Sequence, residues 1–330
     1  MARWLVTGSN GFLGRHLVRL LAERGHEVVA LVRQGAAEFP PGVIVRRGDV
    51  LEERTLLDAC AGCDGVFHCA GFVSRKPEDA EDLYRVHVTG TKNVAGAAKL
   101  ASARRLVIAS SSGTVAVSDD PDHVCVETDE TPIGILQRWP YYRAKLFAER
   151  AALAENGPDL EVVSVNPTLL LGPGDVAGSS TEDVRLFLER KVPAVPAGGV
   201  SYVDVRDAAL GMLLAMEKGV PGKRYLLGAC NLTVRELFAR LERVSGVKAP
   251  SLPMPRAPGL SRIGASLAER ALSRVGVTMP VDAVSLEMAQ YFWYLDPSLA
   301  ESELGSTARD PIQTLRDTVE DLRARGVVWP

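Results

Sequence analysis

The chain opens with an apolar run that breaks at three evenly spaced glycines and resumes as a helical pattern, and this opening constrains the fold more than any other feature. Residues 4–6 are typical of a strand buried on both faces, and apolar side chains then recur at helical spacing from residue 12 to residue 21. Gly8, Gly11 and Gly14 lie where the two patterns meet. The predicted order is therefore strand, tight turn and helix.

The spacing of these glycines suits a turn on which a pyrophosphate rests. The first glycine permits the chain reversal, the second lets the backbone approach the phosphates, and the third lets the helix pack on the strand. The helix N-terminus adds unpaired N–H groups and partial positive charge. We therefore expect dinucleotide contacts from the glycines and from their neighbours Asn10, Phe12 and Leu13. The alternative is a glycine-rich turn that merely joins two elements.

The end of the second predicted strand, residues 27–33, bears on which nicotinamide dinucleotide is bound. In such folds an acidic side chain about 20 residues past the glycines binds the ribose 2′-hydroxyl, whereas an Arg accommodates a 2′-phosphate. Here the position is Arg33, and the next carboxylate is Glu38. A guanidinium pairs with a phosphate that a carboxylate would repel. The sequence favours NADP(H), with NAD(H) as the second choice; the alternative is that Arg33 is a solvated cation.

Composition and charge exclude several classes of function. The 330 residues include 38 basic and 41 acidic side chains, mixed along the chain, for a net charge of −3. No basic face is therefore indicated that would bind nucleic acid or an anionic membrane. Neither a signal peptide nor a membrane-spanning apolar run is found, so we expect a cytoplasmic protein. Cys60 and Cys63 form a C-x-x-C pair without partners at zinc spacing, which predicts reduced thiols and no metal.

Two later strand ends provide further predicted cofactor contacts. The third strand is followed by Asp49 and Val50, where an adenine would lie; Asp49 either accepts from its exocyclic amine, caps the next helix, or does both. The fourth strand ends in Ala70 and Gly71, small residues that let backbone pass near a cofactor. His68, inside that strand, is interpreted as a core histidine.

The middle of the chain places polar residues in unusual positions. Asn93 lies within a predicted helix over residues 77–101, where an Asn is unfavourable unless it faces solvent or acts in the interior. The fifth strand, residues 105–109, is followed by three consecutive serines. An acidic loop over residues 118–140 is longer than an ordinary connection, which indicates a functional or lid-like segment.

Tyr141 and Lys145 follow this loop at a spacing of four, which places both on one side of a helix. A phenol is a poor base near neutrality, and a neighbouring ammonium favours the phenolate and lowers its pKa. A serine hydroxyl from the end of the fifth strand would hydrogen-bond the same substrate oxygen. This pattern predicts proton transfer coupled to hydride transfer; the alternative is an exposed tyrosine beside a lysine.

In combination these motifs resemble the extended short-chain dehydrogenases/reductases, most closely the dihydroflavonol-reductase-like and 3β-hydroxysteroid-dehydrogenase-like branch. The segments that carry the resemblance are T-G-x-x-G-F-L-G at residues 7–14, G-D-V at 48–50, G-T-x-N-V at 90–94, S-S-S-G-T-V at 110–115 and P-Y-Y-R-A-K at 140–145.

The resemblance implies a Ser-Tyr-Lys triad with Asn93 as a structural or proton-relay residue. Counting along the strand favours Ser111 as the serine, whereas counting back from Val115 favours Ser112; we choose Ser111. The N-P-x-x-x-x-G-P segment that starts at residue 166 resembles the family's segment at the nicotinamide, which assigns Pro167 to the cofactor site.

These patterns predict a Rossmann-type, doubly wound parallel sheet over residues 1–166 and a smaller C-terminal substrate domain over 167–330, with segments around 200–230 returning to the sheet. An apolar helical stripe at residues 260–272 and an aromatic run at 291–294 fall in the second part. The aromatic run either lines a pocket or packs into the core. The resemblance also makes a homodimer through residues 79–101 and 141–156 an expectation.

The leading functional hypothesis is reduction of a ketone or aldehyde, or oxidation of the alcohol, with a small-molecule substrate. One alternative is a nucleotide-sugar epimerase or dehydratase that retains its cofactor; it would need cations such as Arg185, Arg190 and Lys191 for a substrate diphosphate. A second alternative is a catalytically silent NAD(P)-sensing protein on the same fold.

Overall fold

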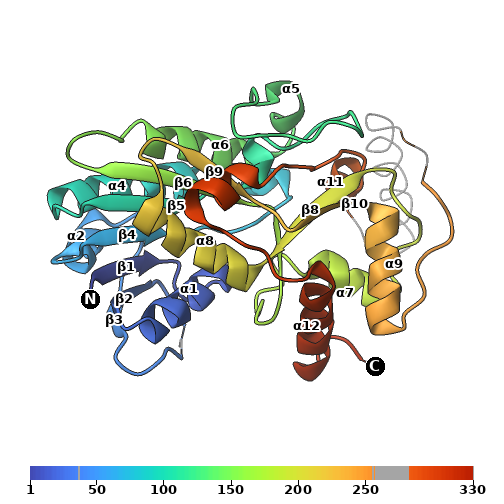
Figure 1. Cartoon of the computed structure of the whole chain (residues 1–330), viewed down its shortest axis with the longest axis horizontal. Helices are drawn as coiled ribbons and strands as arrows, with labels where there is room; N and C mark the ends of the chain where they lie inside the picture. The colour runs from blue at the N-terminus through green and yellow to red at the C-terminus, as the bar shows by residue number, and fades with distance from the viewer. Residues whose placement is uncertain (36–37, 255, 257–281, 330) are drawn as a thin grey trace.

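The computed structural model describes residues 1–35, 38–254, 256 and 282–329. Its larger part is a seven-stranded parallel sheet in the order β3-β2-β1-β4-β5-β6-β9 (Figure 1). This order, which grows outward from β1 in both directions, is that of a doubly wound dinucleotide-binding sheet, so the predicted fold class is confirmed. The strands are β1 (Arg3–Thr7), β2 (Glu27–Val32), β3 (Ile44–Arg47), β4 (Gly65–His68), β5 (Arg105–Ala109), β6 (Glu161–Pro167) and β9 (Arg224–Leu227).

Helices cover both faces of this sheet because its central strands are apolar on both sides. One buried cluster joins the sheet to α1 (Phe12–Glu23) and α8 (Val205–Lys218). A second cluster joins the other face to α2 (Glu53–Cys60), α4 (Gly90–Leu100) and α6 (Pro140–Leu153). The carboxyl ends of β1, β4, β5 and β6 therefore meet at one edge, between two layers of helices.

A smaller unit with its own apolar core is built from segments that begin after β6 and that α8 and β9 of the larger part interrupt in the chain. It contains the three-stranded sheet β10-β8-β7, formed by β7 (Leu169–Leu171), β8 (Gly199–Asp204) and β10 (Cys230–Thr233). Of the segments around 200–230, α8 and β9 lie with the large sheet, whereas β8 belongs to the small one. Figure 1 shows this unit at the end opposite the N-terminus, with α7 (Glu182–Leu188), α9 (Val234–Ser245) and α12 (Pro311–Ala324).

The helical segment predicted over residues 77–101 is present over residues 77–100, but the helix type changes along it. It consists of η1 (Pro77–Asp79), α3 (Ala80–Tyr84), the π-helical turn η2 (Arg85–Thr89) and α4. In the π turn, His87 is buried and its Nε2 lies 2.8 Å from the carbonyl oxygen of Phe72. Single π turns inside helices are frequent at functional sites. This interruption therefore brings a histidine toward the strand ends.

Shorter elements complete the described chain: η3 (Ser112–Thr114), α5 (Ile133–Leu136), α11 (Ala283–Met288) and η4 (Ala300–Leu304). The predicted acidic loop thus contains one short helix. The stripe predicted at residues 260–272 lies outside the described residues. None of the helices in the described ranges is long and apolar enough to span a bilayer.

Candidate active site

The glycine turn between β1 and α1 is packed too closely for side chains. Gly8 adopts a positive φ of 65°, and a Cβ placed there would lie 2.6 Å from the backbone nitrogen of Ala70. A Cβ on Gly14 would lie 2.1 Å from the carbonyl oxygen of Gly8. Real Cβ atoms do not approach backbone so closely, so both positions need glycine. Gly71 is similarly constrained, because a Cβ there would meet the His87 ring at 2.4 Å.

The N-terminus of α1 has the features that a bound diphosphate requires. Its N-cap residue, Gly11, is exposed and provides no side-chain cap, and the first turn contains no acidic residue. The first N–H groups of the helix, at Phe12 and Leu13, have no intrahelical acceptor. An anion at this end would receive these hydrogen bonds and the favourable end of the helix dipole. The residues present therefore fit a dinucleotide.

The remaining predicted cofactor residues lie around the ends of β2 and β3. The Asn10 amide donates to the carbonyl oxygen of Gln34 at 3.1 Å. The Asp49 carboxylate accepts a hydrogen bond from the backbone of Leu51 at 3.0 Å, which is a local turn contact. Arg33 is exposed directly after β2, where its guanidinium is accessible to a ligand.

Asn93 lies inside α4, and its amide donates to the carbonyl oxygen of Val50 at 3.0 Å. This bond ties α4 to the loop that follows β3, because a mid-helix amide here satisfies a loop carbonyl. This contact is consistent with a structural role for Asn93 and gives no support to a role in proton relay.

Tyr141 and Lys145 come from the first two turns of α6. The Lys145 Nζ donates to the carbonyl oxygen of Ala109, the last residue of β5, at 2.8 Å. The Tyr141 ring packs edge-on against His87, with ring centroids 5.7 Å apart, and against Tyr142, with centroids 5.1 Å apart. The lysine thus lies against the carboxyl edge of the sheet.

Burial determines the protonation of these two groups. Desolvation lowers the pKa of Lys145 to about 8, against the opposing influence of Cys69 and Glu149. Desolvation raises the pKa of the Tyr141 phenol above its usual value, and Tyr142 adds to this effect. The expected lowering of the phenol pKa by the ammonium is therefore not found in this structure. Burial penalises the phenolate because it is the charged form of the side chain.

The three serines after β5 have different surroundings. Ser110 donates a short hydrogen bond to the Glu149 carboxylate. The Ser111 hydroxyl caps η3 by accepting from the backbone N–H of Gly113 at 3.3 Å. Within the described residues the Ser112 hydroxyl has no hydrogen-bond partner, although Ser112 itself is buried.

A cluster of aromatic rings surrounds Tyr142, the neighbour of Tyr141. Trp293 packs against Tyr142 with ring centroids 4.9 Å apart, and Trp139 packs against both, 5.4 Å from Trp293 and 6.0 Å from Tyr142. A Cβ on Gly113 would collide with the Tyr142 ring at 2.2 Å. In the predicted run 291–294, the first two side chains are buried in the core, whereas Trp293 is half-buried next to the site.

Sequence reasoning missed two residues at this site, His87 and Glu149. Glu149 follows Lys145 at a spacing of four, which is a detectable signal for a shared helix face. His87 reaches the site through tertiary packing and had no such signal.

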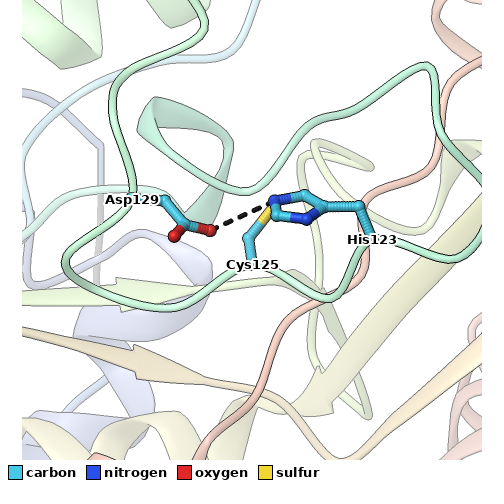
Figure 2. Close-up of side chains that lie close together, drawn as sticks. All are labelled: His123, Cys125 and Asp129. Carbon is cyan, nitrogen blue, oxygen red and sulfur yellow. Dashed lines mark hydrogen bonds and ion pairs between the residues drawn. The ribbon is translucent and has the colours of Figure 1, made fainter.

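The cysteines give no indication of a disulfide. Cys60 and Cys63 are free thiols at and just after the end of α2, and burial raises their pKa values to about 12 and about 11. Figure 2 shows a separate group, His123, Cys125 and Asp129, whose donor atoms lie within 4.8 Å of one another. Its imidazole already bonds the carboxylate at 3.1 Å, and burial raises the pKa of its thiol to about 11. We therefore assign no metal to this group.

Fold and site together define a dinucleotide-binding protein with a tyrosine and a lysine at the carboxyl edge of its parallel sheet. The model of a family described as the NAD dependent epimerase/dehydratase family matches residues 4–228. The chain belongs to this family, which agrees with the resemblance to extended short-chain dehydrogenases/reductases.

Individual relatives extend over the whole chain. A protein of Synechocystis named "Putative dihydroflavonol 4-reductase" is 34% identical over 98% of this chain and 96% of its own. The sterol demethylase protein B of Methylococcus capsulatus is 31% identical over 98% of this chain and 99% of its own. The crystal structure of gox2253 is similar with a TM-score of 0.84 and 27% identity, covering 100% of both chains.

A further solved structure contains a dinucleotide. MoeE5 in complex with UDP-glucose and NAD has a TM-score of 0.74 and 26% identity, covering 98% of this chain and 99% of its own. Together with the family and its reductases, this likeness identifies the protein as an NAD(P)-dependent enzyme of the oxidoreductase or epimerase type.

Proposed function

We propose that this protein is an NADP(H)-dependent reductase of a small ketone or aldehyde. The observation that carries the proposal is the position of Lys145 on Ala109, with Tyr141 one helical turn away, at the sheet edge that also carries the glycine turn. The names of the full-length relatives add support, because the Synechocystis relative is named as a reductase.

A bound NADPH supplies a hydride to the carbonyl carbon. The chain's own contribution is to hold the carbonyl oxygen and to give it a proton from the Tyr141 hydroxyl. Burial raises the pKa of this phenol, so it carries its proton at neutral pH and is ready to act as the acid. This state suits reduction better than alcohol oxidation, which requires the phenolate as a base. The Lys145 ammonium stabilises the negative charge that develops on the tyrosine oxygen.

A serine hydroxyl is proposed as the second hydrogen-bond donor to the substrate oxygen. The sequence favours Ser111. Ser112, whose hydroxyl is free within the described residues, remains the alternative. The Ser111 hydroxyl accepts a backbone hydrogen bond in η3, and its own O–H stays available to donate. Asn93 and Pro167 remain proposed contributors, the first through its bond to Val50 and the second at the end of β6.

The preference for NADP(H) over NAD(H) is proposed from Arg33. Its exposed side chain follows β2, the position at which the ribose 2′-substituent is read in this fold. A 2′-phosphate there would gain a charge-assisted hydrogen bond.

The epimerase or dehydratase alternative is less favoured by the surroundings of the cations it needs. Arg185 pairs with Glu182 at 2.5 Å and with Glu189 at 2.6 Å. Lys191 pairs with Glu189 at 2.9 Å. Internal carboxylates thus compete for two of the three charges that a substrate diphosphate would use; the third, on exposed Arg190, makes no ion pair within the described residues.

A panel of carbonyl compounds, followed by NADPH absorbance, tests the proposal. Turnover with release of NADP⁺ is the expected result. Tightly held oxidised cofactor after purification would instead favour the epimerase alternative, and no turnover on any compound would favour a silent NAD(P)-sensing protein.

A homodimer and a cytoplasmic location also remain proposals. The dimer is supported by the exposed aromatic pair Tyr84 and Phe147, which pack edge-on with ring centroids 6.4 Å apart on α3 and α6. Both helices fall within the segments expected to form the interface.

A further inference from the structure

Helix α6 carries a third functional group in line with Tyr141 and Lys145. Glu149 follows the lysine by four residues and the tyrosine by eight, so the three side chains share one side of the helix. The Glu149 side chain is fully buried. A buried carboxylate is costly unless it is paired and hydrogen-bonded. Its partners therefore indicate what it does.

Four groups from different elements meet this carboxylate. Its Oε2 accepts a short hydrogen bond from Ser110 and one from Thr114 Oγ1 at 3.1 Å. The same oxygen accepts from the Asn166 amide at 2.6 Å. Its Oε1 lies 3.1 Å from the Arg224 guanidinium. Glu149 thus joins α6 to the end of β5, to η3, to β6 and to β9.

Asn166 extends this network to the turn that carries the candidate serines. Its amide also donates to the carbonyl oxygen of Ser111 at 3.0 Å and to Thr114 Oγ1 at 3.1 Å. Its own Oδ1 accepts from Ser164 at 2.7 Å. The serine turn, residues 110–114, is therefore held against α6 by buried hydrogen bonds that converge on Glu149.

Glu149 is also a neighbour of Lys145 in the site. Both residues line one small cavity at the carboxyl edge of the sheet. Burial keeps four other titratable neighbours uncharged at neutral pH. It lowers the pKa values of the His68 and His87 imidazoles. It raises those of the Cys69 thiol and the Tyr141 phenol. The Glu149 carboxylate favours the ammonium form of Lys145, and Arg224 on β9 faces that carboxylate.

We propose that Glu149 is a positioning residue for the reductase reaction: its carboxylate ties the serine turn to α6 and provides a negative charge in the cavity that it shares with Lys145. The inference rests on the proposed function, in which the serine, the tyrosine and the lysine act on one substrate oxygen. It assigns to Glu149 no contact with substrate or cofactor.

Glu149→Gln keeps the shape of the side chain and removes its charge. We expect kcat to fall about 10- to 100-fold, because the serine turn is no longer held in position against α6. The dissociation constant for NADPH should change little. The high-pH limit of kcat should move down by about one pH unit, because Lys145 loses its neighbouring negative charge. Glu155→Gln is the matched control: this residue lies just beyond α6 and pairs with Lys99. It should leave both quantities unchanged.

Arg224→Gln should shift the high-pH limit of kcat in the direction opposite to the shift in Glu149→Gln. This variant removes the cation that faces Glu149, so the carboxylate acts on Lys145 without opposition and the high-pH limit of kcat should move up. General loosening of the fold would not shift the limit in opposite directions in the two variants. The arginine variant also keeps the inference testable where Glu149→Gln fails to fold.

The pKa of Lys145, measured by NMR of labelled lysine side chains and assigned with Lys145→Met, gives a readout independent of turnover. We expect it to fall in Glu149→Gln and rise in Arg224→Gln. Unchanged values in both variants would overturn the inference and leave the reductase proposal standing. Absence of turnover by the parent enzyme on every carbonyl would refute the proposed function, whereas the NMR shifts would still test the role of Glu149.

Discussion

The ammonium of Lys145 donates a hydrogen bond to the carbonyl oxygen of Ala109, 2.8 Å away, and so fixes helix α6 on the carboxyl end of β5. Through this contact the lysine and Tyr141, one turn earlier, lie at the edge where the glycine turn of β1 also ends. The proposed chemistry depends on this arrangement.

The pKa of Lys145 predicts how activity depends on pH. Burial lowers this pKa from its ordinary value to about 8, so the ammonium is present below pH 8 and is lost as the pH rises through that value. We expect kcat to fall above about pH 8, well below the pKa of about 10.4 of a free lysine. A pH profile of kcat measures this limit. In Lys145→Arg the group stays charged throughout, so any remaining activity should lack the limit; the same limit in that variant would assign it to another group.

Arg33→Ala tests the cofactor preference. Loss of a charge-assisted hydrogen bond to a 2′-phosphate should raise the dissociation constant for NADPH about 10-fold or more and leave that for NADH nearly unchanged. Fluorescence titration with both dinucleotides measures the two constants. Arg24→Ala, at an exposed arginine after α1, is the control. Equal affinity for NADPH and NADH in the parent and in Arg33→Ala would remove the argument.

Single alanine substitutions distinguish the candidate serines. Replacing the serine that donates to the substrate oxygen should lower kcat about 100-fold, because removal of one oxyanion-hole donor has an effect of this size. Its neighbour should cost much less. The sequence assigns the larger loss to Ser111→Ala; a larger loss in Ser112→Ala would assign the role to Ser112. Losses below about 3-fold in both variants would exclude a serine from the reaction.

Gly14→Ala and Gly96→Ala form a matched pair of variants that tests how closely α1 packs on β1. A Cβ on Gly14 would lie 2.1 Å from the carbonyl oxygen of Gly8, whereas a Cβ on Gly96, inside α4, meets nothing within 4 Å. We expect Gly14→Ala to lower the free energy of unfolding by about 1–3 kcal/mol and to weaken dinucleotide binding. Gly96→Ala should raise it by up to about 1 kcal/mol. Chemical denaturation measures both; equal stability of the two variants would contradict the close packing of α1 on β1.

Much of the fold is predictable from local pattern. The apolar strands, the glycine turn and the helix that carries Tyr141 follow from residue spacing, since each depends on neighbours close in sequence. The π turn at His87 does not, because it is stabilised by a bond to the Phe72 carbonyl and by packing on Tyr141. Such contacts exist only once the sheet has formed.

The site was predictable in its residues more than in its electrostatics. The spacing of Tyr141 and Lys145 indicates their shared helix face, but burial determines the pKa of the phenol, and burial is a property of the whole fold. The surroundings of Glu149 were likewise only partly predictable from the sequence. Its spacing from Lys145 is visible in the sequence, whereas its partners Asn166 and Arg224 come from distant strands.

The central claim is that Tyr141 gives the proton in an NADPH-dependent reduction. The most direct test is kcat of Tyr141→Phe on the best carbonyl from the panel, beside Tyr142→Phe and the NADPH dissociation constant of each variant. We predict that Tyr141→Phe loses at least about 100-fold in kcat while binding NADPH as the parent does, and that Tyr142→Phe keeps most of its activity. Near-parental turnover by Tyr141→Phe would contradict the account.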